Sequence, residues 1–205
     1  MAIQNPSLET LQDIKRIMER SSRFISLSGL SGLSTGICAL AGAYFAHTWI
    51  DAHAKTNDDG YALKLKLIFL ALSVLVVALL SAGYFTWRRA NKNHLPLWDH
   101  SSKKLFINLM IPLAAGGLFA AGLLYHNEWK FVSPACLVFY GLALVNASKY
   151  TLSDIRSVGI IEILIGLTNM YYTDYGLYFW AAGFGVLHIV YGLIMWWKYE
   201  KRQMA

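Results

Sequence analysis

The chain has 205 residues, of which 56% are hydrophobic and only 15% are charged, whereas a soluble domain is about a quarter charged. This composition argues against an ordinary soluble globular domain. The formal net charge of +6 could indicate nucleic-acid binding, but no basic and aromatic recognition module accompanies it, so we expect no nucleic-acid partner.

The first expected element is an amphipathic helix in residues 1–23. Apolar side chains recur at helical spacing from Leu8 to Met18, and charged side chains occupy the opposite face. The sequence NPS at 5–7 supplies a helix start. We expect this helix either to lie on the cytoplasmic membrane surface or to pack on the cytoplasmic ends of the helices that follow.

Six long stretches in residues 24–199 carry almost no charged side chains. A helix of about 20 residues crosses the roughly 30 Å hydrocarbon core of a bilayer. The alternating pattern of a β-barrel is absent, so helices are the remaining way to satisfy the backbone in lipid. The sequence predicts an all-α polytopic membrane protein whose six transmembrane helices form three hairpins, with a cytoplasmic tail at 200–205. The predicted spans are 24–50, 64–88, 105–126, 131–151, 155–172 and 175–197.

The distribution of positive charge predicts the orientation. If the N-terminus is cytoplasmic, 14 of the 18 Lys and Arg residues lie on the inner side and 4 on the outer side. Cytoplasmic loops carry such an excess in membrane proteins. The sequence therefore predicts that both termini are cytoplasmic.

The first span contains the stretch GLSGLSTG, residues 29–36. Its first four residues match the G-x-S-G of rhomboid intramembrane proteases, and its last five match the G-x-S-x-G elbow of α/β-hydrolases. A serine nucleophile needs a paired base and oxyanion donors, and the elbow needs a strand-to-helix turn. Ser28, Gly32 and Gly36 instead share one helix face, where small residues let a second helix approach closely. We interpret this stretch as a packing face and predict no catalytic residue.

Polar residues inside the later spans are the main candidates for a functional site. A central carboxylate such as Glu162 costs about 2.5–3.5 kcal/mol in lipid, so it should face the bundle interior. The helical rise places Glu162, Asn146 and His188 in the inner half of the bundle, with Lys149 one turn nearer the cytoplasm. Asn169 continues the face of Glu162. The sequence predicts a polar layer that binds a proton, an ion or a small solute. The alternative is an internal salt bridge between Glu162 and Lys149, with Asn146 and His188 hydrogen-bonded to the backbone or to tyrosines.

A second group of polar residues lies at the predicted outer ends of the first two hairpins. His47 and Asp51 share a helix face, and imidazole with carboxylate is a ligand set for Zn²⁺ or another divalent metal. Ordinary polar loop residues are the alternative, and no other cofactor is predicted. The full candidate metal set is His47, Asp51, His53, His126 and Glu128.

Two stretches resemble an uncharacterised family of six-span bacterial inner-membrane proteins: LWDHSSKKLFINLMIPLAAGG at 97–117 and GFGVLHIVYG at 183–192. The order of hairpins and the spacing of small residues are similar to those of HdeD-type membrane proteins. This resemblance implies a multi-pass protein of the bacterial inner membrane. It implies no activity and no substrate.

Three functions remain open on the sequence. The first is binding or translocation of a small solute or ion through the polar layer, with Glu162 and His188 exchanging protons. The second is a non-catalytic subunit or sensor whose 88–104 loop and surface helix contact a cytoplasmic protein. The third is an enzyme acting on lipid, although no acid, metal or serine signature favours it. The lipid bilayer is the expected partner, and a second copy of the chain could be another.

Overall fold

The computed structural model describes residues 28–55, 60–93 and 100–200, and every regular element in these ranges is helical. The helical run from Thr173 to Glu200 is continuous, and we call it the last helix. The predicted helix in 1–23 and the tail from 201 lie outside the described residues. The elements are α2 (Gly29–His53), α3 (Tyr61–Lys92), α4 (His100–Tyr125), η1 (Trp129–Phe131), α5 (Val132–Ala147), η2 (Ser148–Tyr150), α6 (Asp154–Tyr171), η3 (Thr173–Tyr175), α7 (Gly176–Trp180), η4 (Ala181–Leu187), α8 (His188–Met195) and η5 (Trp196–Glu200).

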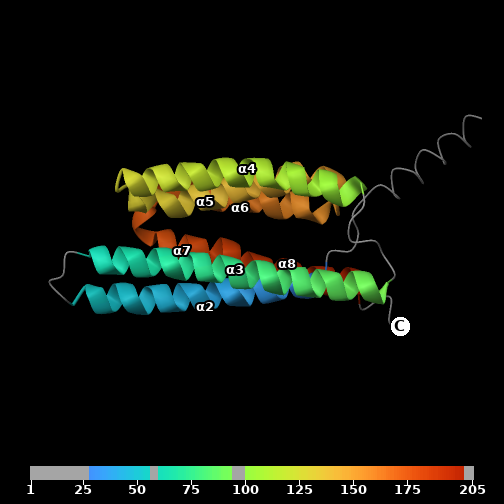
Figure 1. Ribbon diagram of the computed structural model, residues 1–205, viewed down its shortest axis with the longest axis horizontal. Helices are drawn as coiled ribbons and strands as arrows, with labels where there is room; N and C mark the ends of the chain where they lie inside the picture. Colours follow the sequence, from blue (N-terminus) through green and yellow to red (C-terminus); the bar gives the residue numbers. More distant parts are fainter. Residues whose placement is uncertain (1–27, 56–59, 94–99, 201–205) are drawn as a thin grey trace, which may run out of the picture.

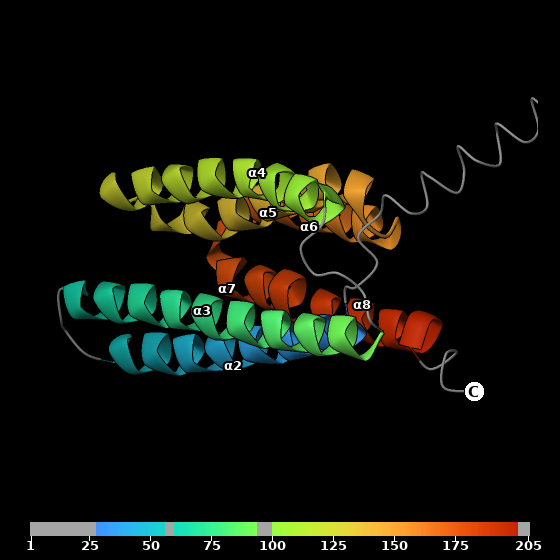
Figure 2. The same ribbon diagram turned by 45° about the vertical axis from the view of Figure 1, so that its right-hand side comes forward.

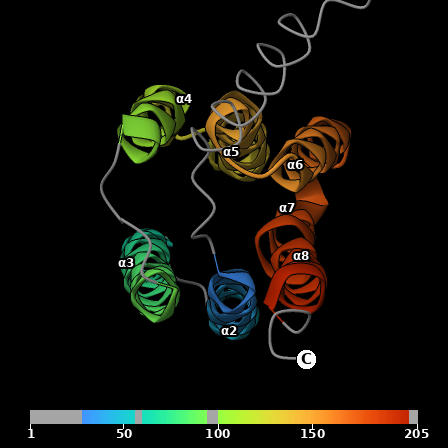
Figure 3. The same ribbon diagram turned by 90° about the vertical axis from the view of Figure 1, so that its right-hand side faces the viewer.

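The helices form two layers, seen edge-on in Figure 1 and end-on in Figure 3. In one layer α2 packs between α3 and α8, and in the other α5 packs between α4 and α6. The last helix is inclined between the layers (Figure 2): α7 contacts α5 and α6, whereas α8 packs on α2. The third predicted hairpin is therefore splayed, and its second helix joins the two layers.

The described helices have the length and composition of membrane spans. Five segments are long and apolar enough to cross a bilayer. The helix α6 has 18 residues, about 27 Å of rise, and carries three charged side chains, those of Asp154, Arg156 and Glu162. The five segments are Gly29–His53, Tyr61–Lys92, Ser101–Tyr125, Trp129–Tyr150 and Thr173–Lys198.

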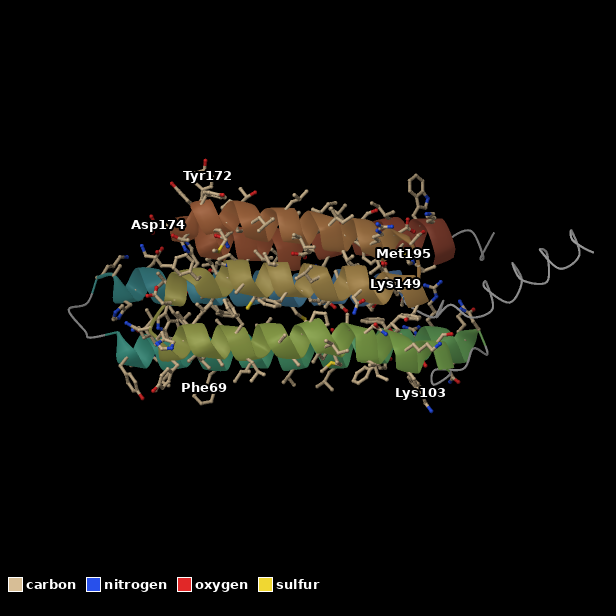
Figure 4. The ribbon with its side chains drawn as sticks, turned by 90° about the horizontal axis from the view of Figure 1, so that it is seen from above. Phe69, Lys103, Lys149, Tyr172, Asp174 and Met195 are labelled. Atoms are coloured by element: carbon tan, nitrogen blue, oxygen red, sulfur yellow. The ribbon has the colours of Figure 1, made fainter. Side chains whose placement is uncertain are left out.

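Large apolar side chains cover the outside of the bundle. Phe69, Leu80 and Leu118 are 70%, 69% and 77% exposed, and Figure 4 shows Phe69 pointing away from the helices. Such an apolar surface is unfavourable in water, whereas lipid solvates it. The buried positions include the polar residues Glu162 and Asn169. An apolar outside and polar groups inside indicate a multi-pass helical membrane protein.

Glycines bring two pairs of helices into backbone contact. A Cβ atom on Gly141 of α5 would lie 2.6 Å from the carbonyl oxygen of Gly159 on α6. A Cβ atom on Gly29 of α2 would lie 2.4 Å from the amide nitrogen of Trp196, and one on Gly36 would lie 2.6 Å from the carbonyl oxygen of Gly185. The interpretation of GLSGLSTG as a packing face is confirmed, because its glycines lie against the last helix.

The serine hydroxyls of this stretch bond within the bundle. Ser31 donates to the carbonyl oxygen of Ser28 at 2.5 Å, and Ser34 donates to that of Ser31 at 3.0 Å. The Ser34 hydroxyl also lies 3.3 Å from that of Ser81 on α3. These are the local bonds that Ser commonly makes in transmembrane helices.

Candidate functional site: a buried Glu162, His188 and Tyr140 cluster

Glu162 lies near the middle of α6, about 12 Å from Asp154 at the start of that helix. Its side chain is fully buried. A Cβ atom on Gly183 would lie 2.5 Å from Oε2 of Glu162 and 2.4 Å from Cδ2 of Leu137. The carboxyl group is therefore held between α5 and the last helix, as the cost of a lipid-facing carboxylate predicts.

His188, the first residue of α8, lies beside this carboxyl group. Its Nδ1 atom is 3.5 Å from Oε1 of Glu162 and 3.0 Å from the carbonyl oxygen of Gly183. Its Nε2 atom is 2.8 Å from the hydroxyl of Tyr140 on α5. A carbonyl oxygen only accepts hydrogen bonds, so Nδ1 carries a proton and donates it to Gly183. Neutral His188 then accepts from the Tyr140 hydroxyl at Nε2, and protonated His188 would donate to it.

The charge of this pair follows from its burial. Within the described parts of the chain, neither oxygen of Glu162 has a hydrogen-bond donor. An isolated carboxylate in this position would carry a penalty of several kcal/mol. The pair avoids a net charge when Glu162 is protonated beside neutral His188, or ionised beside protonated His188. Both states contain the same number of protons, so the two residues share one exchangeable proton.

Tyr140 is a functional candidate that the sequence did not single out, although a tyrosine partner for His188 was part of the alternative. Its ring centroid lies 5.4 Å from that of His188 and 5.1 Å from that of Phe184. A tyrosine in an apolar helix is usually read as core or as an interface anchor. The signal that could have found it is depth, because residue 140 is nine or more residues from either end of the predicted span 131–151.

Asn146 and Lys149 lie away from the cluster, although we predicted them in one layer with Glu162. The amide of Asn146 donates to the carbonyl oxygen of Asn108 on α4 at 2.8 Å. Lys149 is exposed, and Figure 4 shows it at the same end of the bundle as Lys103. Among the described side chains, Glu162 has its ion-pair contact with His188 and none with Lys149. The alternative salt bridge is therefore not formed.

Asn169 also faces the interior, but at another level. It lies seven residues from Glu162 on α6, about 10 Å along the axis. Its Nδ2 atom donates to the Ser133 hydroxyl on α5 at 2.9 Å, and that hydroxyl donates to the carbonyl oxygen of Gly176 at 2.7 Å. The candidate residues thus occupy three separate levels of the bundle.

Ion pairs hold the last helix at both ends. Near its start, Nζ of Lys130 lies 2.9 Å from Oδ1 of Asp174. Near its end, Nζ of Lys198 lies 3.0 Å from Oδ2 of Asp154 on α6. The Glu162 level lies between these two contacts, which are solvent-accessible pairs of the kind that contributes at most about 1 kcal/mol each.

The candidate metal ligands do not gather into a metal centre in the structure. His47 and Asp51 contact each other, with Nε2 3.5 Å from Oδ2. The His126 ring packs edge-on against Tyr125. Across residues 28–55, 60–93 and 100–200, no three His, Cys, Asp or Glu side chains are placed to hold a metal ion. A divalent metal stays a prediction for His47 and Asp51.

The fold and the buried cluster define a class, that of multi-pass helical membrane proteins with ionisable groups in the bundle interior. Comparisons of the chain with protein-family models, with curated proteins and with solved structures found no match.

Proposed function

We propose that this protein binds a proton, or a small solute or ion whose passage is coupled to one, at the Glu162–His188 pair and moves it across the membrane. The observation that carries the proposal is the position of Glu162. Its carboxyl group is fully buried, lacks a hydrogen-bond donor in the described chain and lies 3.5 Å from an imidazole nitrogen. Ionisable groups inside membrane spans are expensive and typically serve ion pathways or proton relays.

The chemistry of the pair supports proton exchange. Imidazole is the side chain that most readily gains and loses a proton near neutral pH, and carboxyl groups in protein interiors also serve as general acids and bases. Tyr140 holds the imidazole from the other side and fixes its orientation. A proton arriving at Glu162 can be stored there as the neutral carboxylic acid. Nδ1 of His188 already carries a proton, so the nitrogen that can accept another one is Nε2, which faces Tyr140.

We propose six crossings with both termini in the cytoplasm of a bacterium, the protein lying in the inner membrane. Lys103 and Lys149 lie at one end of the bundle, and Tyr172 and Asp174 lie at the other (Figure 4). The positive-inside rule assigns the lysine end to the cytoplasm. The Glu162 pair then lies close to the middle of the hydrocarbon core.

Proton flux into vesicles tests the proposal. The purified protein is reconstituted in liposomes that contain a trapped pH-sensitive dye, and a potassium diffusion potential set by valinomycin drives proton entry. We expect the unmodified protein to acidify the lumen faster than empty liposomes, and Glu162→Gln to abolish this difference. The matched control is Glu128→Gln, the same change at an exposed carboxylate, which should leave the flux unchanged.

Two results would contradict the proposal. One is that the lumen of liposomes with the unmodified protein acidifies no faster than that of empty liposomes, with or without a sodium or potassium gradient. The other is a Glu162→Gln variant that retains full flux, because proton movement would then not pass through this carboxyl group.

A further inference from the structure

The hydrogen bonds around Asn169 leave one of its atoms without a partner. The Ser133 hydroxyl has a single hydrogen, which it donates to the carbonyl oxygen of Gly176, since a carbonyl can only accept. The Ser133 oxygen must therefore accept from Asn169, which fixes Nδ2 on that side of the amide. Oδ1 of Asn169 then points elsewhere, and within the described residues it has no donor.

A fully buried amide oxygen without a donor indicates a bound molecule. Asn169 has no exposed surface. Buried oxygens in native proteins are bonded either to protein groups or to ordered water. Only a molecule that donates hydrogen bonds or carries positive charge satisfies this atom, so water or hydronium fits and an anion does not.

The same kind of unsatisfied oxygen occurs at Glu162, two turns away on the same buried face of α6. Only Gly166 lies between them among the buried residues of that helix. Acceptor oxygens at two successive levels, about 10 Å apart, suit a short chain of water molecules that passes protons. This face leads from Glu162 toward the end of the bundle that contains Asp174.

Among the described residues, the opposite direction along α6 has no polar side chain on its buried face. From Glu162 toward Asp154, the buried residues of α6 are Gly159, Val158 and Ile155. Gly159 lies in backbone contact with Gly141, because a Cβ atom on either would lie within 2.7 Å of the other's carbonyl oxygen. On that side of His188, the last helix carries Tyr191 one turn further on and Lys198 at its end.

We propose that Glu162 exchanges its proton with the Asp174 end of the bundle through water bound at Oδ1 of Asn169, and that the Asp154 end is closed in this conformation. Asn169 is a positioning residue in this route, since it orients the water and holds no transported proton itself. The inference deepens the proposed function, because it says from which side the Glu162–His188 pair is loaded.

Hydrogen–deuterium exchange at the carboxyl group tests the route. Infrared spectra of the reconstituted protein are recorded over time after transfer from H₂O to D₂O. The band that is followed is the protonated carboxyl band that is missing in Glu162→Gln, and the pH is acidic enough for this band to be present. We expect Asn169→Leu to slow the isotope shift of this band by roughly tenfold or more, because the leucine can hold no bridging water. The controls are Asn146→Leu, the same change in the opposite half of the bundle, and Tyr191→Phe; neither should slow the shift.

A second variant keeps the test decisive if Asn169→Leu fails to fold. A Cβ atom on Gly176 would lie 3.5 Å from its nearest neighbour and 4.0 Å from Oδ1 of Asn169, so Gly176→Ala introduces no clash. Its methyl group would occupy space next to Oδ1, and we expect it to slow exchange as well. Exchange at the unmodified rate in both variants, or slower exchange in Tyr191→Phe alone, would overturn the route. If Asn169→Leu exchanges slowly but the unmodified protein gives no proton flux in vesicles, the route is supported and the transport function is refuted.

Discussion

Gly183 of the last helix lies directly against the carboxyl group of Glu162, since a Cβ atom at position 183 would lie 2.5 Å from Oε2. It also supplies the carbonyl oxygen that accepts from Nδ1 of His188 at 3.0 Å. One residue without a side chain therefore makes room for the carboxylate and orients the imidazole. This contact links the packing of the bundle to the chemistry of the pair.

The first prediction concerns this contact. Gly183→Ala should destabilise the protein by about 1–3 kcal/mol, the usual cost of overpacking a filled interior. It should also reduce proton flux, because the methyl group displaces the carboxylate from His188. The free energy of unfolding in mixed detergent micelles measures the first effect, and the vesicle assay measures the second.

The matched control is Gly117→Ala on α4, where a Cβ atom would meet nothing within 4 Å. This change should leave stability and flux close to those of the unmodified protein. Equal effects of the two glycine changes would show that position 183 has no special contact with Glu162.

The second prediction concerns Tyr140, whose hydroxyl lies 2.8 Å from Nε2 of His188. Tyr140→Phe removes this partner and leaves a buried ring nitrogen unpaired, which should cost about 1–3 kcal/mol of stability. The control is Tyr84→Phe, at a residue that is 55% exposed, and it should cost little. A Tyr140→Phe variant as stable as this control would contradict the hydrogen bond.

The third prediction separates packing from chemistry in the GLSGLSTG stretch. A Cβ atom on Gly192 would lie 2.5 Å from the amide nitrogen of Leu33 and 2.7 Å from the carbonyl oxygen of Gly29. Both atoms belong to the backbone, so Gly192→Ala must push α2 and α8 apart and should cost about 1–3 kcal/mol. Ser34→Ala loses the bond to the carbonyl oxygen of Ser31 within α2 and the 3.3 Å hydroxyl contact with Ser81 on α3. A side-chain hydrogen bond between helices is worth about 0.6 kcal/mol on average in a membrane. Unfolding in mixed micelles compares the two, and a larger effect of the serine change would favour a special role for Ser34.

The fourth prediction concerns orientation. Single cysteines replace Lys103 and Lys130, which are exposed at opposite ends of the bundle, in a background without Cys38 and Cys136. A membrane-impermeant maleimide applied to intact cells should label the cysteine at 130 and should label that at 103 only after the membrane is opened. The reverse pattern would place both ends on the other side and contradict the positive-inside assignment.

Much of the fold could be predicted from the sequence because lipid imposes simple requirements. Apolar stretches of about 20 residues must be helical to satisfy their backbone groups, and the described helices fall on the six predicted stretches. Their ends were less predictable: α3 continues to Lys92, beyond the predicted end at residue 88, since long basic side chains can extend the helix into the headgroup region.

The candidate site was predicted only in part. Glu162 and His188 were expected in one polar layer, and their side chains lie 3.5 Å apart. Asn146 was expected beside them, but its amide bonds to α4 instead. Helical rise gives the depth of a residue in the membrane, whereas its direction depends on the rotation of the helix about its axis. Gly141 lies against Gly159, and Gly166 lies against Leu137 and Val138, so Glu162 is level with residues near 140. Asn146 therefore lies about 9 Å further along α5.

The sequence by itself determined that this chain forms apolar helices and that a carboxylate within them faces inward, because the cost of exposing backbone or charge to lipid allows little else. Only the tertiary structure decided which polar groups meet. The last helix crosses from α5 and α6 to α2, and its π-helical turn at Ala181–Leu187 directly precedes His188. Such a wider turn changes the direction of every later side chain, and this rotation brings His188 to both Glu162 and Tyr140.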